Sequence, residues 1–263
     1  MISSLFYDYT DGKQSLEQLA EKYQLSVKTI RSKLIKYKVI IPEHKPTETV
    51  IIMDTTYFRR NFGVMVFRDV YHKNNLYWND VNYETIRLYK RGVNLLKIRG
   101  WKIKAIVCDG RKGLFKAFPG IPIQMCHFHQ LAIIRRYLTQ KPRLEAHIEL
   151  KQLSSVLTSI DKESWVFALD QWHLKWHEYL KEKTIDPITG KWHYTHKKLR
   201  GAYQSLKTHT PYLFTFRDYP ELKIPNTTNS LDGSFTNLKS KLRNHQGIKN
   251  HMKIMLTDHF LAK

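Results

Sequence analysis

The hydrophobic pattern at the start of the chain predicts two short helices joined by a tight turn. Ser15 precedes apolar residues at helical spacing, and Gln18, three residues later, completes the pattern of a capping box. After a short break at Gln24-Leu25, Ser26 is positioned to cap a second helix. The inward positions of that second helix are Val27, Ile30 and Leu34.

The outward face of the second helix is basic and polar. It carries Lys28, Thr29, Arg31, Ser32, Lys33 and Lys36. Two short helices with a basic second helix, over residues 1–40, are typical of a helix-turn-helix module, whose second helix enters the major groove of DNA. An ordinary helical hairpin with a solvated basic face has the same pattern.

A mixed order of strands and helices follows a linker at residues 41–48, which contains two prolines. In chain order, the pattern predicts strands over 49–58, 62–71 and 75–81, a helix over 83–100, a strand over 103–108, a short helix over 112–117 and a strand over 121–126. The helix over 83–100 has Ile86, Val93, Leu96 and Ile98 among its apolar positions. This order predicts an α/β domain with a mixed sheet.

The pattern becomes mainly helical and rich in aromatic residues from about residue 129 to residue 218. Four tryptophans lie there: Trp165, Trp172, Trp176 and Trp192. Tryptophans at such spacing are more often core residues than platforms for nucleic-acid bases, so we expect at most one or two to reach DNA. Two further helices are predicted over 226–244 and 248–262.

Charge indicates a polyanionic partner. Lys and Arg number 44 against 23 Asp and Glu, which gives a net charge of +21 spread along the chain. Nucleic acid fits this balance, and a ribosome-associated protein or a generally basic proteome is the alternative. Two cysteines are too few for a disulfide framework, and no apolar run is long enough to span a bilayer. With no signal peptide in view, we expect a cytoplasmic protein.

Three acids stand where carboxylates could converge. Asp54 is expected to end one apolar strand and Asp109 to end another, while Asp232 lies in the first turns of the helix predicted over 226–244. Phosphodiester chemistry needs clustered carboxylate oxygens, because two Mg²⁺ ions about 3.5–4 Å apart activate the attacking oxygen and stabilise the leaving one. Acids at strand ends are also common as turn residues or helix caps.

At this point the sequence resembles the Mutator-like DDE transposases of bacterial insertion sequences, from about residue 49 to the end of the chain. The residues that carry the resemblance are Asp54-Thr55-Thr56, Asp109-Gly110, Gln124-x-Cys126-x-x-His129 and Thr227-Thr228-Asn229-x-x-Asp232-Gly233, followed by Lys239, Arg243 and His245-Gln246-Gly247. The resemblance implies an RNase H-like catalytic domain over 49–263 with a helical insertion at about 130–225. The tryptophan-rich segment occupies the place of that insertion.

The resemblance also implies the catalytic residues. Asp54, Asp109 and Asp232 would hold two Mg²⁺ or Mn²⁺ ions. Asp232 stands where the family normally has Glu. A carboxylate one methylene shorter predicts weaker metal binding rather than lost chemistry, and it leaves open an impaired copy. Many related enzymes carry a zinc ribbon before the helix-turn-helix, and this chain has no Cys-rich segment there.

Cys126 and His129 match the C-x-x-H signature of the group. We expect Cys126 to pack in the core and His129 to cap or hydrogen-bond near the active site. Cys108 is expected to be a core residue. A four-ligand zinc site would need distant partners such as His173 and His177, or His193 and His196, so zinc is not expected.

A basic stretch near the C-terminus is expected to grip DNA phosphates beside the metal site. Residues 233–257 contain no acid and include Lys239, Lys241, Arg243, Lys249 and Lys253. A solvated helix face is the alternative. The sequence thus predicts a transposase that binds terminal inverted repeats and target DNA as a homodimer or larger assembly. The rivals are a non-catalytic DNA-binding derivative and another RNase H-like nuclease, such as a junction resolvase.

Overall fold

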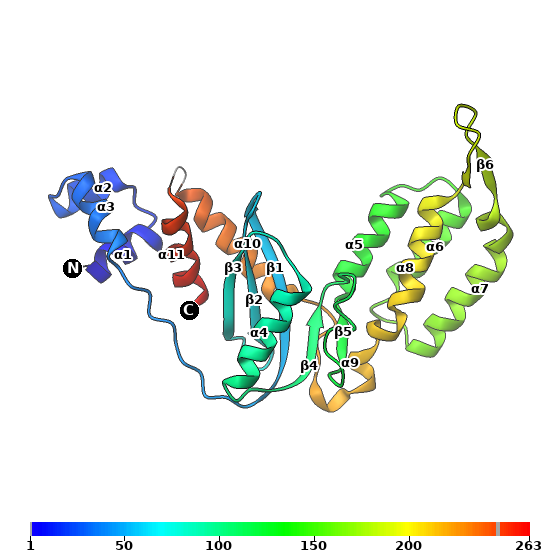
Figure 1. The fold of residues 1–263 in the computed structure, drawn as a ribbon, viewed down its shortest axis with the longest axis horizontal. Coiled ribbons are helices and arrows are strands. Elements are labelled where there is room, and N and C mark those ends of the chain that lie inside the picture. The colour runs from blue at the N-terminus through cyan, green and yellow to red at the C-terminus, as the bar shows by residue number, and fades with distance from the viewer. Residues whose placement is uncertain (1, 246–247) are drawn as a thin grey trace.

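The fold of residues 2–245 and 248–263 is described by a computed structural model, which begins with three short helices (Figure 1). These are α1 (Ile2–Thr10), α2 (Leu16–Tyr23) and α3 (Val27–Ile35). Both predicted caps are present: Ser15 forms a complete capping box with Gln18, and Ser26 accepts a hydrogen bond from the amide of Thr29. Gln24 adopts the left-handed conformation that ends α2.

Helix α1 was not predicted from the sequence, and it joins the module to the rest of the chain. Its Leu5, Phe6 and Tyr9 are buried in one cluster with α2, α3 and the C-terminal helices α10 (Asn229–Asn244) and α11 (Asn250–Leu261). Phe6 stacks on Tyr37 with ring centroids 3.9 Å apart. The three helices therefore pack onto the C-terminal helices.

A mixed five-stranded sheet forms the centre of the fold. Its strands are β1 (Glu48–Arg59), β2 (Phe62–Asp69), β3 (Asn75–Val81), β4 (Lys102–Cys108) and β5 (Ile123–Met125), in the order β3-β2-β1-β4-β5. The first three strands pair antiparallel, and β4 and β5 run parallel to β1. Helix α4 (Ile86–Ile98) makes the crossover from β3 to β4. The predicted mixed α/β architecture is confirmed.

Alternating residues of β1 pack in two separate hydrophobic cores, one on each face of the sheet. Ile51 and Met53 pack in the cluster that contains α4, whereas Val50 and Ile52 pack in the cluster that contains α10 and α11. The period of two along a strand sends successive side chains to opposite faces. Because both faces are covered, β1 is a nearly continuous apolar run.

Mostly helical elements fill the segment between β5 and α10, and they lie beside the sheet in Figure 1. They are α5 (His127–Leu138), α6 (Glu145–Ser155), α7 (Lys162–Lys181), β6 (Lys183–Ile185), β7 (Trp192–Tyr194), α8 (Lys197–Leu213), α9 (Thr215–Asp218) and the 3₁₀ turn η1 (Pro220–Leu222). Trp165 and Trp172 are buried in the core of this unit, whereas Trp192 is 56% exposed. The β6–β7 hairpin was not predicted.

Three local predictions were wrong. Residues 112–117 form turns instead of a short helix, and Gly113 there has φ +87°, a value that breaks a helix. Ile98, at the end of α4, is 82% exposed and does not belong to the buried face of that helix. Asp54 does not end its strand, because β1 continues to Arg59.

No helix in the described ranges 2–245 and 248–263 combines the length and the apolar character that a membrane crossing requires.

Candidate active site

Asp54 lies on the central strand, just beyond the point where β1 and β4 stop pairing. The last paired residues are Ile52 and Val107, so Asp54 and the end of β4 lie at the same part of the sheet. On its other side β1 still pairs with β2, where Asp54 faces Val66. The sequence singled out Asp54 as the end of a strand; in the structure only the pairing of β1 with β4 ends near it, while the strand itself continues.

Asp232 reaches the site from the first turn of α10. The Thr228 hydroxyl donates to Oδ2 of Asp232 at 3.0 Å, and Thr228 is fully buried. Arg68 of β2 fixes the same turn to the sheet, because its guanidinium donates to the carbonyl of Ser230 at 2.6 Å and to the hydroxyl of Ser234 at 3.0 Å. These contacts hold the helix so that Asp232 faces β1.

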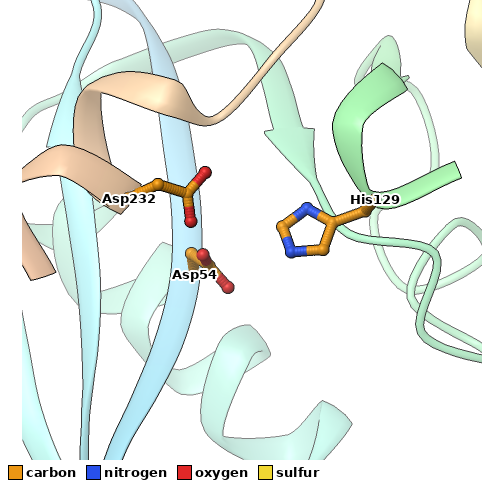
Figure 2. Close-up of side chains that lie close together, drawn as sticks. All are labelled: Asp54, His129 and Asp232. Atoms are coloured by element: carbon orange, nitrogen blue, oxygen red, sulfur yellow. The ribbon is translucent and has the colours of Figure 1, made fainter. Parts of the chain in front are cut away.

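His129 completes a group with these two acids. Ligand atoms of Asp54, His129 and Asp232 all lie within 4.8 Å of one another, and Figure 2 shows the imidazole directed toward the two carboxylates. The three residues come from β1, α5 and α10, which are far apart in the sequence. The C-x-x-H motif had pointed to His129, but only as a residue near the site; its place among the carboxylates was missed.

Burial dominates the electrostatics of Asp54. Asp54 is only 8% exposed, and this burial raises the pKa of its carboxyl to about 7. The His129 imidazole and the amide of Thr55, which donates to Asp54 at 2.8 Å, oppose this shift. The charges of Asp232 and Asp109 add to the increase. A divalent cation would offset the same repulsion.

His129 is the cationic partner in this cluster. The neighbouring Cys126 thiol raises the pKa of His129 to about 9 despite the opposing effect of burial, and the charges of Asp54 and Asp109 act in the same direction as Cys126. Its Nδ1 is buried and has no hydrogen-bond partner within the described part of the chain. A buried nitrogen without a partner beside two carboxylates fits a site that receives a ligand or ion.

Cys126 lies behind His129, in the core, as the sequence predicted. It is fully buried, and its sulfur accepts hydrogen bonds from the Thr228 amide at 3.3 Å and from the Thr228 hydroxyl at 3.4 Å. Burial would raise the pKa of the thiol, but the interactions with His129 and Thr228 outweigh it and lower the pKa. Cys126 thus links the start of α5 to the residue that orients Asp232. Cys108 is also fully buried, as expected.

Asp109 lies near this group without belonging to it. Its carboxylate accepts the amide of Arg111 at 3.1 Å, and its charge contributes to the pKa shifts of Asp54, His129 and Glu84. In the described residues, the set with ligand atoms within 4.8 Å contains Asp54, His129 and Asp232 only. The structure therefore brings two of the three predicted acids together and leaves the third at the edge of the site.

A second polar network, which sequence reasoning missed, lies beside Asp109. Glu84 accepts a hydrogen bond from the Tyr89 hydroxyl at 2.7 Å and pairs with Arg111 at 3.1 Å. The Tyr89 hydroxyl also lies 3.0 Å from the Thr55 hydroxyl, next to Asp54. Burial raises the pKa of Glu84, and the charge of Asp109 adds to this shift. No sequence motif marks Glu84, because it lies in the loop before α4.

The donors of the group fit a divalent cation. Carboxylate oxygens suit Mg²⁺ and Mn²⁺, whereas imidazole is a better ligand for Mn²⁺ and later transition metals than for Mg²⁺. Asp54 and Asp232 provide the oxygens and His129 provides the nitrogen. The histidines considered as zinc partners, His173, His177, His193 and His196, do not join this group within the described ranges.

A basic groove runs along α10 and α11 at the end of β1. It has a volume of about 530 Å³ and is lined by Tyr57, Phe58, Lys239, Leu242, Arg243, His245 and Lys253. Two predicted DNA-binding residues, Lys239 and Arg243, therefore share a groove with two aromatic side chains. Lys241 points elsewhere, because it forms an ion pair with Asp11 at 2.7 Å. Gln246 and Gly247 of the family-like motif lie outside the described residues.

The basic face of α3 is partly open to solvent. Lys28, Arg31, Ser32 and Lys36 are exposed, whereas Thr29 and Lys33 are half-buried. The Thr29 hydroxyl is 2.9 Å from that of Ser26 and takes part in the cap. Four of the six predicted contact residues are thus free to meet a partner.

No protein-family model matches this chain, and no curated protein matches its sequence.

Proposed function

We propose that the chain is a DDE-type transposase, which cleaves transposon ends and transfers the new 3′ end to target DNA. The observation that carries this proposal is the group of Asp54, Asp232 and His129, whose ligand atoms lie within 4.8 Å of one another on a mixed sheet. Asp109 adds a third acidic charge nearby. A net charge of +21 and the groove of Lys239, Arg243 and Lys253 favour DNA as the substrate.

The sheet supports an RNase H-like assignment. An antiparallel meander of β1, β2 and β3 is followed by parallel β4 and β5. The first acid is on the central strand, the second follows β4, and the third is on a helix that covers the sheet after a mostly helical insertion. This order is the one that the resemblance to Mutator-like transposases implies.

Asp54 and Asp232 would hold one divalent cation, with His129 beside them. The family resemblance implies that Asp109 would join them in holding two ions. Bound Mg²⁺ or Mn²⁺ supplies a more acidic attacking water or 3′-hydroxyl and neutralises charge on the phosphate. The raised pKa of Asp54 means that a cation competes with a proton for this carboxylate near neutral pH.

The chain's own residues would orient the DNA and balance its charge. Without a bound metal, the His129 imidazole has a pKa of about 9 and is cationic at neutral pH, so it balances the charge of the acids; it would become a metal ligand only on losing that proton. Lys239, Arg243 and Lys253 would bind phosphates along the groove, and Tyr57 offers an aromatic surface there. The exposed face of α3 would read terminal inverted repeats in the major groove. Joining two ends requires at least two protomers on DNA.

A plasmid-nicking assay tests this function. The full chain is incubated with supercoiled DNA that carries the element's ends, in Mg²⁺ and separately in Mn²⁺, and the 3′ ends are mapped. We expect nicks at the ends, followed by strand-transfer products that require a free 3′-hydroxyl. Asp54→Asn and Asp232→Asn should abolish both products while DNA binding, measured by anisotropy, remains. Equal nicking by the parent and both variants would overturn the proposal.

The second candidate function is a DNA-binding derivative without catalysis. The position of Asp109 outside the three-residue group favours it, because the second metal site then lacks a converged ligand set. This candidate predicts specific DNA binding with no nicking in either metal. Restored nicking in Asp232→Glu, with an inactive parent, would identify a decayed transposase.

A further inference from the structure

The β6–β7 hairpin extends beyond the ends of the neighbouring helices α6 and α7 (Figure 1). Backbone and aromatic contacts hold its base against α7 and α8. The amide of Thr195 donates to the carbonyl of Glu182 at 2.9 Å, and His196 stacks on Tyr179 with ring centroids 3.7 Å apart. The guanidinium of Arg200 lies 3.7 Å from the centroid of the Tyr194 ring. A hairpin anchored in this way projects from the protein in a defined direction.

One face of the hairpin combines apolar and cationic side chains. Lys183 pairs with Tyr194 and Ile185 pairs with Trp192 across the two strands, so all four side chains share a face. Ile185 is 68% exposed and Trp192 is 56% exposed. The Lys183 ammonium lies 4.1 Å from the centroid of the Trp192 ring, which holds the charge over the aromatic surface.

The tip of the hairpin presents an apolar side chain to solvent. Ile188 is 93% exposed. The Asp186 carboxylate accepts the amides of Ile188 at 2.8 Å and Thr189 at 3.2 Å, and Gly190 supplies the positive φ that closes the turn. The turn therefore holds Ile188 outward. Ile185, Ile188 and Trp192 are thus exposed together on one short hairpin, as apolar side chains are at contact surfaces.

Charge decides which partner fits this surface. The acids of the hairpin are engaged internally: Asp186 by the turn, and Glu182 by His196 at 2.9 Å. Lys183 and Lys191 are exposed, and neither has a carboxylate partner among the ion pairs of the described residues. In the absence of DNA, a net charge of +21 disfavours a second copy of the chain as the partner, and the two edges are short and flanked by lysines, which disfavours strand addition. A polyanion is attracted.

We propose that the β6–β7 hairpin is a DNA-contacting finger that enters the major groove of a duplex. A two-stranded ribbon fits a groove about 12 Å wide. Ile188 at the tip then meets base edges such as thymine methyl groups, and Lys183 and Lys191 meet the phosphates on either side. The proposal rests on the proposed function, in that the chain acts on DNA. It adds a contact distant from both α3 and the acids.

Binding of the full chain to a fluorescent duplex, measured by anisotropy in EDTA across a salt series, tests the finger. We expect Ile188→Ser to weaken binding roughly tenfold without changing the salt slope, because the lost contact is apolar. Lys183→Gln combined with Lys191→Gln should reduce the slope by about 1.8, since each phosphate contact contributes about 0.9. Leu174→Ser on α7, where Leu174 is 63% exposed, is the matched apolar control. Lys90→Gln with Lys97→Gln on α4 is the matched control for charge.

Guanine N7 lies in the major groove, so we expect its methylation to inhibit binding of the parent at certain positions in the duplex. At those positions, methylation should no longer inhibit binding of Ile188→Ser. Hairpin variants that match the parent in affinity, slope and interference would overturn the finger. A change of oligomeric state in Ile188→Ser with unchanged DNA binding would overturn it in favour of a protein contact. Because binding is measured without metal, a chain that binds through the finger but never nicks DNA would contradict the proposed function alone. A chain with no affinity for DNA would contradict both.

Discussion

The hydroxyl of Thr228 donates a hydrogen bond to the Asp232 carboxylate at 3.0 Å, and its amide donates to the sulfur of Cys126. One buried residue therefore connects the first turn of α10 with the start of α5, and so connects Asp232 with the helix that carries His129. Preorganisation of this kind fixes carboxylate geometry before a metal or substrate arrives.

Replacing Asp232 tests its role as a metal ligand. Asp232→Asn should eliminate nicking, because an amide lacks the anionic oxygen that a divalent cation requires. Asp232→Glu should keep or raise activity, most visibly at low Mg²⁺, where metal affinity limits the rate. Nicking rates over a metal titration provide the measurement. If Asp232 only complemented the start of α10, a contribution of roughly 0.3–1 kcal/mol, Asp232→Asn would cut DNA normally.

Asp54→Asn should stabilise the metal-free protein above neutral pH. The pKa of Asp54 is raised from 3.8 to about 7, so between those values the folded state retains a proton that the unfolded state loses. Stability therefore falls as pH rises through this window, and the cost is fully present above pH 7. Because this raised pKa already includes the attraction to His129, we expect a gain on the order of 2–4 kcal/mol at pH 8 and little change at pH 4. Denaturant titrations in EDTA check this.

Added Mn²⁺ supplies the control for that measurement. A cation at 100 times its dissociation constant should stabilise the parent by about 2.7 kcal/mol and leave Asp54→Asn nearly unchanged. Equal stabilisation of both proteins would show that the metal binds elsewhere.

His129→Ala should weaken Mn²⁺ binding more than Mg²⁺ binding, because imidazole prefers the softer ion. Cys126→Ser should instead lower stability, since a smaller, more polar group replaces a fully buried sulfur that accepts two hydrogen bonds from Thr228. Calorimetric metal titration and thermal unfolding separate the two effects. Equal metal affinities for His129→Ala and the parent would remove His129 from the ligand set. Elemental analysis that found one zinc per chain would assign Cys126 and His129 to a zinc site instead.

Asp11 is predicted to hold the N-terminal helices on the C-terminal ones. Its carboxylate pairs with Lys241 at 2.7 Å, with Lys263 at 2.6 Å and with His259 at 3.3 Å. Burial opposes ionisation of Asp11, but these three partners outweigh it and lower its pKa. The stabilisation is therefore present above the ordinary Asp pKa and lost as pH falls below it. Asp11→Asn should increase amide exchange in α1 and α11 at pH 7.

Asp8→Asn is the matched control, because Asp8 pairs with Lys22 inside the N-terminal helices. It should leave exchange in α11 unchanged. Identical exchange in α11 for the parent and Asp11→Asn would show that apolar packing alone holds the two parts together.

Signals from residues close together in the sequence were enough to predict helix starts with a capping side chain and strands with continuous apolar runs. Ser15 and Ser26 define helix starts because their side chains satisfy amides within the next turn, and this requires no distant partner. The apolar runs of β1 and β4 identified the buried strands, since a strand covered on both faces needs apolar residues at successive positions. These elements were enough to predict a mixed α/β fold, and the motifs singled out Asp54 and Asp232, which the structure places near each other.

Only the tertiary structure decided which side chains meet. His129 joins Asp54 and Asp232 because α5 and α10 both begin beside the open end of the β1–β4 pairing, and periodicity contains no information on how helices from distant segments converge. Lys241 turns toward Asp11, 230 residues away in the sequence, and thus leaves the predicted basic face. The β6–β7 hairpin was missed because three-residue strands are too short for an alternating pattern, and long-range anchors such as Arg200 on Tyr194 hold it in place.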